Sequence, residues 1–292
     1  MPTAISPGPS SRSPTRPSTE STSATTLSEH PIAARWRALR AGEGTGTRRA
    51  ALIPYLTAGF PTPDISLEAL RVVAGAGADF IEVGVPFSDP LADGPTIQRS
   101  TQAALDHGMT VARVLEQIHR AGLSIPVIVM TYLNPVLAFG LERFLREAAA
   151  AGVTGLLLTD FPAGADPALE GTVGASALAL IRLIAPTTTA DRLARAVRGA
   201  SGFLYLISRL GVTGARDRVP ADLSEHVARV RAASSLPLAV GFGISTPAQA
   251  SAAAALADGV VVGSAVVDAL GAGGPDAAGS LVRDLSAAVR AA

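Results

Sequence analysis

The chain has 292 residues, a formal net charge of zero and no cysteine, which excludes disulfides, thiolate metal sites and thiol nucleophiles. All 24 basic residues are arginine, so no lysine can form an imine with a carbonyl substrate. The balanced charge and the few aromatic residues argue against a nucleic-acid-binding surface. The four histidines show no ligand spacing, so we expect no metal site. We also find no apolar run long enough to span a membrane.

The first part of the chain differs in composition from the rest. Ser, Thr and Pro fill 19 of the first 28 positions, and large apolar residues are almost absent. Such a segment cannot bury enough surface to order itself. We therefore predict a disordered tail over residues 1–32 and a single domain over residues 33–292. We expect a cytoplasmic protein, with a plastid location as the alternative if the tail is a transit peptide.

Eight apolar runs recur along the domain, each followed by a stretch with helical signals. Their continuous apolar character is typical of parallel strands that are buried on both faces. Thr62 and Thr246 each precede a proline, which is the pattern of a helix N-cap followed by the first helical residue. Eight alternating units predict a (β/α)₈ TIM barrel, with a doubly wound sheet as the alternative. The predicted strands are 51–57, 80–84, 127–132, 155–159, 178–184, 203–208, 238–240 and 259–262.

Two carboxylates stand where the second predicted strand ends. Glu82 lies among the β-formers of that strand, and Asp93 lies in the loop that follows it. A carboxylate in an apolar strand costs several kcal/mol unless it is satisfied or used. Two carboxylates in different surroundings can divide acid and base roles in catalysis. The alternative is a buried Glu hydrogen-bonded to the backbone, with Asp89 and Asp93 as ordinary turn residues.

The last three predicted loops at the strand ends are rich in glycine and small hydroxyl residues. Backbone N–H groups can approach an anion closely at such glycines, and a following helix N-terminus favours negative charge. Loops 7 and 8 of a barrel are the usual phosphate position. The pattern therefore predicts a phosphate site, although the glycines could serve only to turn the chain. The residues concerned are Gly211, Gly214, Gly241, Gly243, Gly263 and Ser264.

Six segments of the chain follow one another in the order of a known family. They cover residues 54–61, 82–98, 130–135, 185–188, 208–214 and 241–245. Together they resemble the tryptophan synthase alpha subunit family, and the run over 82–98 is the most specific of them. The resemblance implies a TIM barrel that cleaves indole-3-glycerol phosphate to indole and D-glyceraldehyde 3-phosphate by a retro-aldol reaction.

The resemblance also implies roles for individual residues. Glu82 would protonate indole C3 and take the proton of the glycerol C3′ hydroxyl, and Asp93 would accept the indole N–H. Tyr205 would lie beside Glu82 and the substrate, or else would be a core aromatic. Thr213 would belong to a closing loop and contact Asp93. The family's substrate- and phosphate-binding positions are Tyr205, Thr213, Gly214, Gly243, Gly263 and Ser264.

The family's partner is a PLP-dependent beta subunit in an alpha2beta2 heterotetramer, and the resemblance implies no cofactor in this chain. Pro86, Asp89 and Asn134 map to the side that faces this partner. Two alternatives stay open within the family: a stand-alone indole-releasing lyase, and a non-catalytic subunit that only activates a partner. A phosphate-binding barrel isomerase is the alternative at the level of the fold.

Overall fold

The computed structural model describes residues 1, 3–4, 29–43, 46–207, 222–241 and 243–292. Eight parallel strands in this part of the chain form a closed barrel, in which each strand pairs with the next and β8 pairs with β1. The TIM-barrel prediction is confirmed, and the doubly wound alternative is wrong. The strands are β1 (Ala51–Thr57), β2 (Ile81–Gly84), β3 (Val127–Thr131), β4 (Val153–Leu158), β5 (Ala179–Ile184), β6 (Leu204–Ile207), β7 (Leu238–Gly241) and β8 (Gly259–Val262).

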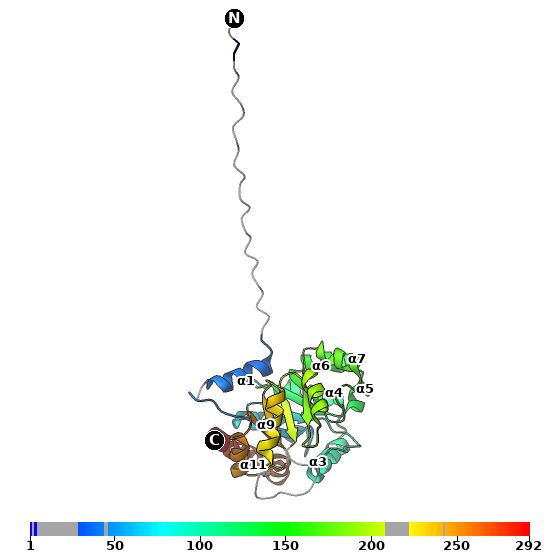
Figure 1. The fold of residues 1–292 in the computed structure, drawn as a ribbon. Coiled ribbons are helices and arrows are strands. Elements are labelled where there is room, and N and C mark those ends of the chain that lie inside the picture. Colours follow the sequence, from blue (N-terminus) through cyan, green and yellow to red (C-terminus); the bar gives the residue numbers. More distant parts are fainter. Residues whose placement is uncertain (2, 5–28, 44–45, 208–221, 242) are drawn as a thin grey trace.

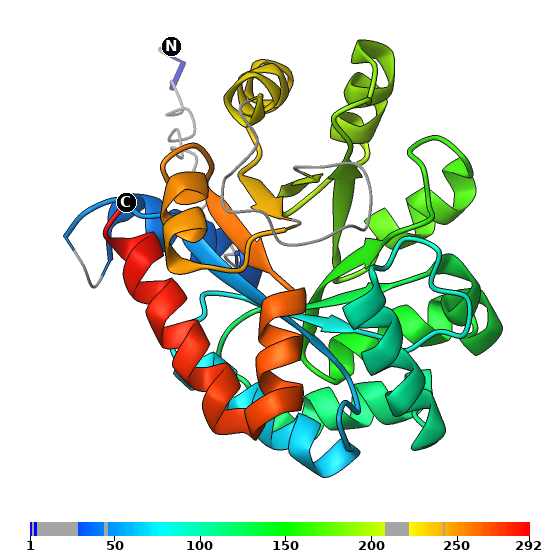
Figure 2. The ribbon, with the colours of Figure 1, turned by 90° about the horizontal axis from the view of Figure 1, so that it is seen from below.

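Helices surround the barrel, and Figure 2 shows them as a ring around the end where the strands finish. None of the described helices is both long and apolar enough to cross a membrane. The last helix is kinked, because Gly273 and Gly274 have non-helical backbone angles just before Pro275. The helices are α1 (Pro31–Ala41), α2 (Pro63–Gly75), α3 (Pro95–Asp106), α4 (Val111–Ala121), α5 (Leu133–Phe139), α6 (Leu141–Ala150), α7 (Pro167–Gly174), α8 (Ala190–Arg198), α9 (Leu223–Ala233), α10 (Pro247–Ala254) and α11 (Ser264–Arg290).

The two helix starts that the sequence indicated are present. The Thr62 hydroxyl accepts the Ile65 N–H, and α2 then begins at Pro63. Thr246 forms a full capping box with Gln249 at the start of α10. These bonds satisfy backbone N–H groups that have no partner inside the helix. The helices therefore begin where the local side chains can cap them.

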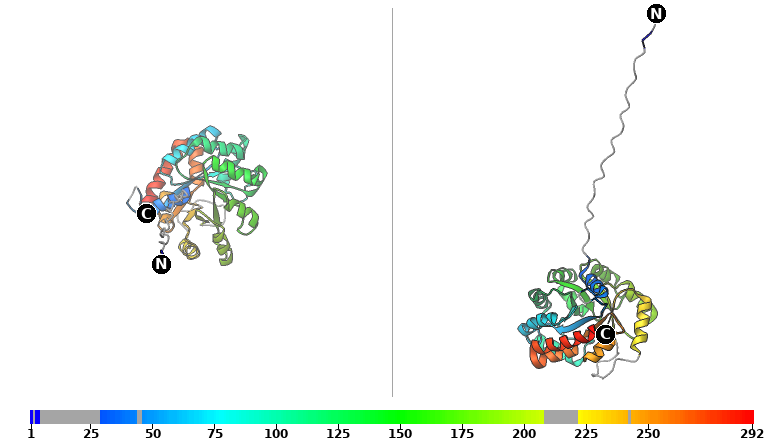
Figure 3. Two further views of the ribbon diagram at one scale, coloured as in Figure 1. Left: turned by 90° about the horizontal axis from the view of Figure 1, so that it is seen from above. Right: turned by 90° about the vertical axis from the view of Figure 1, so that its left-hand side faces the viewer.

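Helix α1 covers the end of the barrel at which the strands begin (Figure 1 and the left view of Figure 3). The Trp36 ring lies 4.8 Å from the ring of Phe80 and 5.6 Å from that of Phe203, between ring centroids. A Cβ added at Gly259 would lie 2.8 Å from the Trp36 ring, so only glycine leaves room for the indole there. Ile32 is fully buried, so the packed part of the chain begins before the expected boundary at residue 33.

A buried carboxylate ties α1 to the barrel. Asp79 has no exposed surface and accepts bonds from Arg35 of α1 at 2.5 Å and from Arg49 at 2.6 and 2.7 Å. Its second oxygen also accepts the Leu52 N–H at 3.0 Å. A buried charge of this kind is stable only when it is paired and fully hydrogen-bonded. Asp79 thus joins three segments at the end of the barrel that lies away from the strand C-termini.

Candidate active site

Glu82 lies on β2 and faces the barrel interior. It follows Phe80 by two residues, so both side chains point to the same face of the strand. Its register partners are Tyr55 on β1 and Ile128 on β3, and only 3% of its surface is exposed. Burial, and next the nearby charge of Asp93, raise the pKa of Glu82 from 4.5 to about 8. Glu82 is therefore protonated at neutral pH and can act as an acid.

Asp93 lies in the loop between β2 and α3, and its backbone is held on both sides. Its N–H donates to Pro90 O at 3.1 Å, and its carbonyl accepts the Gln98 side-chain amide at 2.9 Å. Burial raises the pKa of the Asp93 carboxyl from 3.8 to about 6, and a hydrogen bond from Tyr132 opposes this rise. Asp93 is therefore mostly ionised at neutral pH, when Glu82 is not.

The two predicted carboxyls thus differ in protonation state at neutral pH. The interaction of Asp93 with Glu82 is part of what raises the pKa of Glu82. Between about pH 6 and pH 8, one carboxyl is protonated and the other is ionised. This division is the arrangement in which one group donates a proton and the other stabilises positive charge.

All three tyrosines of the chain lie at this end of the barrel. The pKa of Tyr55 is raised by burial and then by Asp93. The pKa of Tyr205 is raised by burial and then by the charge of Glu82. Of these rings, the sequence interpretation assigned a role only to Tyr205. Tyr55 and Tyr132 could have been noticed because each lies at or near the C-terminal end of a predicted strand.

Two glycines make room for the tyrosines that face the interior. A Cβ added at Gly84 would lie 2.0 Å from Tyr55 Oη, and one added at Gly241 would lie 2.3 Å from Tyr205 Oη. The Tyr55 hydroxyl also begins a buried chain of polar groups. It lies 3.3 Å from the Thr57 hydroxyl, which in turn lies 2.7 Å from that of Ser100. Gly84 and Gly241 therefore let the two rings lie against the neighbouring strands.

Three of the predicted phosphate residues, Gly243, Gly263 and Ser264, follow β7 and β8. Gly243 is exposed and has a φ of 82°, a backbone conformation that favours glycine. Gly263 is the N-cap of α11 and makes no side-chain cap, and Ser264 is the exposed first residue of that helix. The N–H groups of the first turn of a helix are suited to bind an anion. Thr213 and Gly214 lie outside the described residues.

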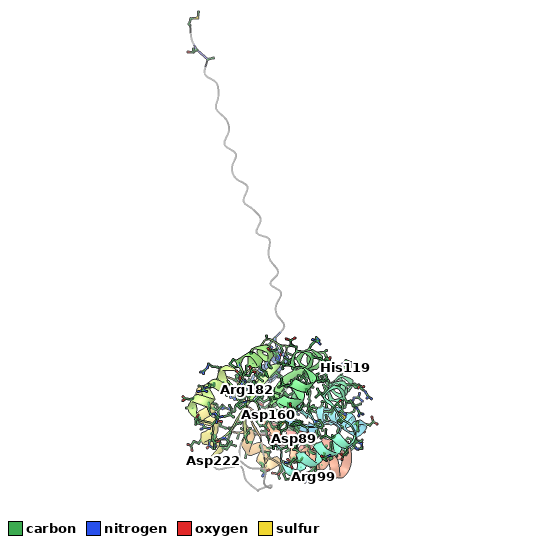
Figure 4. All side chains as sticks on the ribbon, turned by 90° about the vertical axis from the view of Figure 1, so that its right-hand side faces the viewer. Asp89, Arg99, His119, Asp160, Arg182 and Asp222 are labelled. Atoms are coloured by element: carbon green, nitrogen blue, oxygen red, sulfur yellow. The ribbon has the colours of Figure 1, made fainter. Side chains whose placement is uncertain are left out.

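The three predicted interface residues follow β2 and β3. Pro86 is buried, whereas Asp89 and Asn134 are exposed. Asp89 and Asp160 are labelled in Figure 4. The Asp160 carboxylate accepts the Leu133 N–H at 2.7 Å and so caps α5.

Large apolar side chains are also exposed in the segments that follow β2 and β3. These residues are Leu91, 93% exposed, and Leu137, 49% exposed, and the sequence interpretation did not identify either of them.

Within the described ranges, no three His, Asp or Glu side chains gather in a way that could hold a metal ion. The polar groups at this end of the barrel are the carboxyls of Glu82 and Asp93, the tyrosine hydroxyls and the backbone N–H groups at the start of α11.

Known proteins of one family resemble this chain over most of its length. The family described as Tryptophan synthase alpha chain matches residues 43–290. The chain is 47% identical over 270 residues to the Tryptophan synthase alpha chain of Gluconacetobacter diazotrophicus, covering 89% of this chain and 97% of that protein. At 43% identity over 240 residues, it also resembles the protein of that name from Nitratidesulfovibrio vulgaris, covering 82% and 93% of the two chains.

Solved structures agree as well. A structure of Mycobacterium tuberculosis tryptophan synthase superposes with a TM-score of 0.81 at 41% identity, covering 89% of this chain and 98% of that one. The crystal structure of tryptophan synthase subunit alpha from Legionella pneumophila gives a TM-score of 0.81 at 33% identity, covering 90% and 99%. The chain therefore belongs to the tryptophan synthase alpha chain family.

Proposed function

We propose that Glu82 and Asp93 divide the proton transfers of this family's reaction. The chain is a lyase of L-tryptophan biosynthesis that cleaves indole-3-glycerol phosphate to indole and D-glyceraldehyde 3-phosphate. The observation that carries the proposal is the burial of the Glu82 carboxyl on β2, which raises its pKa above that of the less buried Asp93. No lysine imine is possible in this chain, so the cleavage is proposed to proceed by acid–base catalysis at the two carboxyls.

The protonated Glu82 carboxyl donates its proton to indole C3, and the ionised Asp93 carboxylate accepts the indole N–H and stabilises the positive ring. The Glu82 carboxylate then takes the proton of the glycerol C3′ hydroxyl as the C3–C3′ bond breaks. The bonding electrons return to the ring, which leaves as indole, and the C3′ oxygen becomes the aldehyde oxygen. Glu82 ends protonated, as it began.

The substrate phosphate is proposed to bind at Gly243, Gly263 and Ser264, with Thr213 and Gly214 as further contacts. The exposed start of α11 supports this position, because its first N–H groups and its dipole favour an anion. The phosphate would then bind on the side of the barrel mouth formed by β7 and β8, and the reacting carbon would lie on the side of β2. Tyr205 is proposed to line the site beside Glu82.

A PLP-dependent beta subunit is proposed as the partner, in an alpha2beta2 heterotetramer, and PLP is proposed to belong to that subunit alone. Pro86, Asp89 and Asn134 are the proposed contacts. The exposed apolar side chains of Leu91 and Leu137 support this face, because large exposed apolar groups often mark protein interfaces. A cytoplasmic location is proposed with it.

Indole release from indole-3-glycerol phosphate tests the proposal, with the purified chain alone and with a tryptophan synthase beta subunit added. Slow release that rises strongly with the partner supports the coupled subunit. Fast release that ignores the partner would instead favour the stand-alone lyase. A chain that releases no indole in either condition, but activates the beta subunit, would be the non-catalytic alternative.

A further inference from the structure

Arg182 is a buried arginine on the outer side of β5. Ala179 and Ile181 of this strand face the barrel interior, so Arg182 faces the surrounding helices. Only 4% of its side chain is exposed, and 20% is exposed in Glu170 of α7, its ion-pair partner. A Cβ added at Gly199 would lie 3.4 Å from Arg182 Nη2, so the guanidinium packs against the end of α8. The ion pair is therefore enclosed by β5, α7 and α8.

Arg182 and Glu170 together hold the loop that joins β4 to α7. Arg182 Nη1 donates to Phe161 O at 2.9 Å, and the guanidinium carbon lies 5.1 Å from the centroid of the Phe161 ring. Arg182 Nη2 donates to Glu170 Oε1, and the same oxygen accepts the Gly164 N–H at 2.7 Å. One ion pair therefore fixes both a carbonyl and an N–H group of this loop.

Asp160, at the start of the same loop, connects it to α5. The Asp160 carboxylate accepts the Leu133 N–H at 2.7 Å. This N–H belongs to the first residue of α5, where the helix itself offers no acceptor. Helix α5 carries Asn134 and the exposed Leu137, which are proposed to face the beta subunit. The contacts thus run without a break from the ion pair to the helix that bears the proposed interface.

Stability alone does not explain a buried ion pair at this position. Burial removes both charges from water, and well-packed apolar residues of similar size often give an equally stable protein. Among the atoms that the structure describes, Arg182 Nε is also buried without a hydrogen-bond partner. The pair does supply a donor and an acceptor to the loop backbone, which apolar side chains cannot do. Its distinctive effect is therefore on where the loop lies.

We propose that the Arg182–Glu170 ion pair is a positioning device for the partner-facing surface: it holds the β4–α7 loop so that Asp160 caps α5. This inference rests on the proposed contact with the beta subunit. Without the pair, the loop loses two backbone hydrogen bonds and the cap on α5 weakens. The beta subunit then binds less tightly, whereas the two carboxyls on and after β2 keep their surroundings.

The first test replaces both charges at once, with Arg182→Met and Glu170→Met in one chain. This double variant has no unpaired buried charge and should therefore fold. Hydrogen exchange measured by NMR reports on the Leu133 amide directly. That amide should exchange roughly tenfold faster than in the unaltered chain, because its hydrogen bond to a carboxylate is weakened.

The second test measures the affinity for the partner with the same double variant. The readout is the concentration of tryptophan synthase beta subunit that gives half of the maximal rise in indole release. This concentration should increase roughly threefold to tenfold, because the interface is less well organised before binding. Indole release without the beta subunit should stay within about twofold of the unaltered rate, since the ion pair does not touch the acid–base site.

Arg71→Met is the matched control, because Arg71 of α2 also donates to two carbonyls, Arg120 O at 2.6 Å and Ala121 O at 3.4 Å, but joins α2 to α4. It should change neither the exchange of Leu133 nor the half-activating concentration. Unchanged exchange of Leu133 in the double variant would overturn the inference, and so would an unchanged half-activating concentration.

If the double variant fails to fold, Asp160→Ala removes the cap on α5 directly at an exposed side chain. The half-activating concentration should rise in this variant as well, and an unchanged value would equally overturn the inference. An unaltered chain that the beta subunit does not activate would instead refute the proposed partner itself.

Discussion

Replacing Glu82 with Gln should make the protein inactive and, at neutral pH, more stable. The side chain keeps its size but can no longer ionise. In the folded protein the pKa of Glu82 is about 8, against an ordinary value of 4.5. Below pH 4.5 Glu82 is protonated in both the folded and the unfolded protein, so its ionisation does not lower the free energy of unfolding. As the pH rises, the free energy of unfolding falls, because Glu82 loses its proton first in the unfolded chain. The decrease ends above about pH 8, where Glu82 is ionised in both states.

The size of the effect follows from this shift. Each pH unit between the two pKa values lowers the free energy of unfolding by about 1.4 kcal/mol. Between pH 5 and pH 7 the unaltered chain should therefore lose about 3 kcal/mol that Glu82→Gln does not lose. Contributions from other titrating groups are common to both proteins and cancel in the difference.

Urea unfolding followed by circular dichroism at pH 5, 6 and 7 measures this difference. The two stability curves should diverge with rising pH, while indole release by Glu82→Gln is nearly abolished. Glu116→Gln is the control, because Glu116 is exposed on α4, and its curve should run parallel to that of the unaltered chain. If the stability of Glu82→Gln changed with pH in the same way as that of the unaltered chain, burial would not hold Glu82 in its neutral form.

Gly84→Ala tests the packing beside the site and Asp79→Asn tests the ion pairs at the opposite end of the barrel, each with a control substitution. Gly84→Ala should lower stability in thermal unfolding by roughly 1–3 kcal/mol and reduce indole release, because its Cβ displaces the buried Tyr55 hydroxyl. Gly171→Ala is the control: its Cβ meets nothing within 4 Å, so the change should be neutral or slightly stabilising. Asp79→Asn should cost about 3 kcal/mol, because it leaves two arginines without their carboxylate. Asp268→Asn, at a side chain that is 57% exposed, should change stability by less than about 0.5 kcal/mol, and equal losses in both would contradict the account.

The barrel could be predicted from sequence because its strands are read from local signals. Each strand is buried on both faces and is therefore a continuous apolar run bounded by turn residues. Glu82 could be identified for the same reason, since a carboxylate inside such a run is conspicuous. Helix α1 was not predicted as the cover of the barrel, because its contacts with Phe80 and Phe203 join residues far apart in the chain.

The parts of the site that could not be predicted depend on contacts across the fold. Tyr132 lies 40 residues after Ala92 in sequence, and no local pattern indicates that its hydroxyl accepts the Ala92 N–H. Asp160 resembles an ordinary loop residue, although it caps a helix that begins 27 residues earlier. The exposure of Leu91 likewise depends on how its loop folds, since an isolated leucine gives no sign of facing solvent.

The most direct test of the central claim is the pH dependence of kcat/KM for indole release between pH 5 and pH 9.5. The account predicts a bell-shaped profile that rises through about pH 6, as Asp93 ionises, and falls through about pH 8, as Glu82 loses its proton. Asp93→Asn should remove the acid limb. A flat profile, or an acid limb that survives in Asp93→Asn, would show that the two carboxyls do not divide the proton transfers.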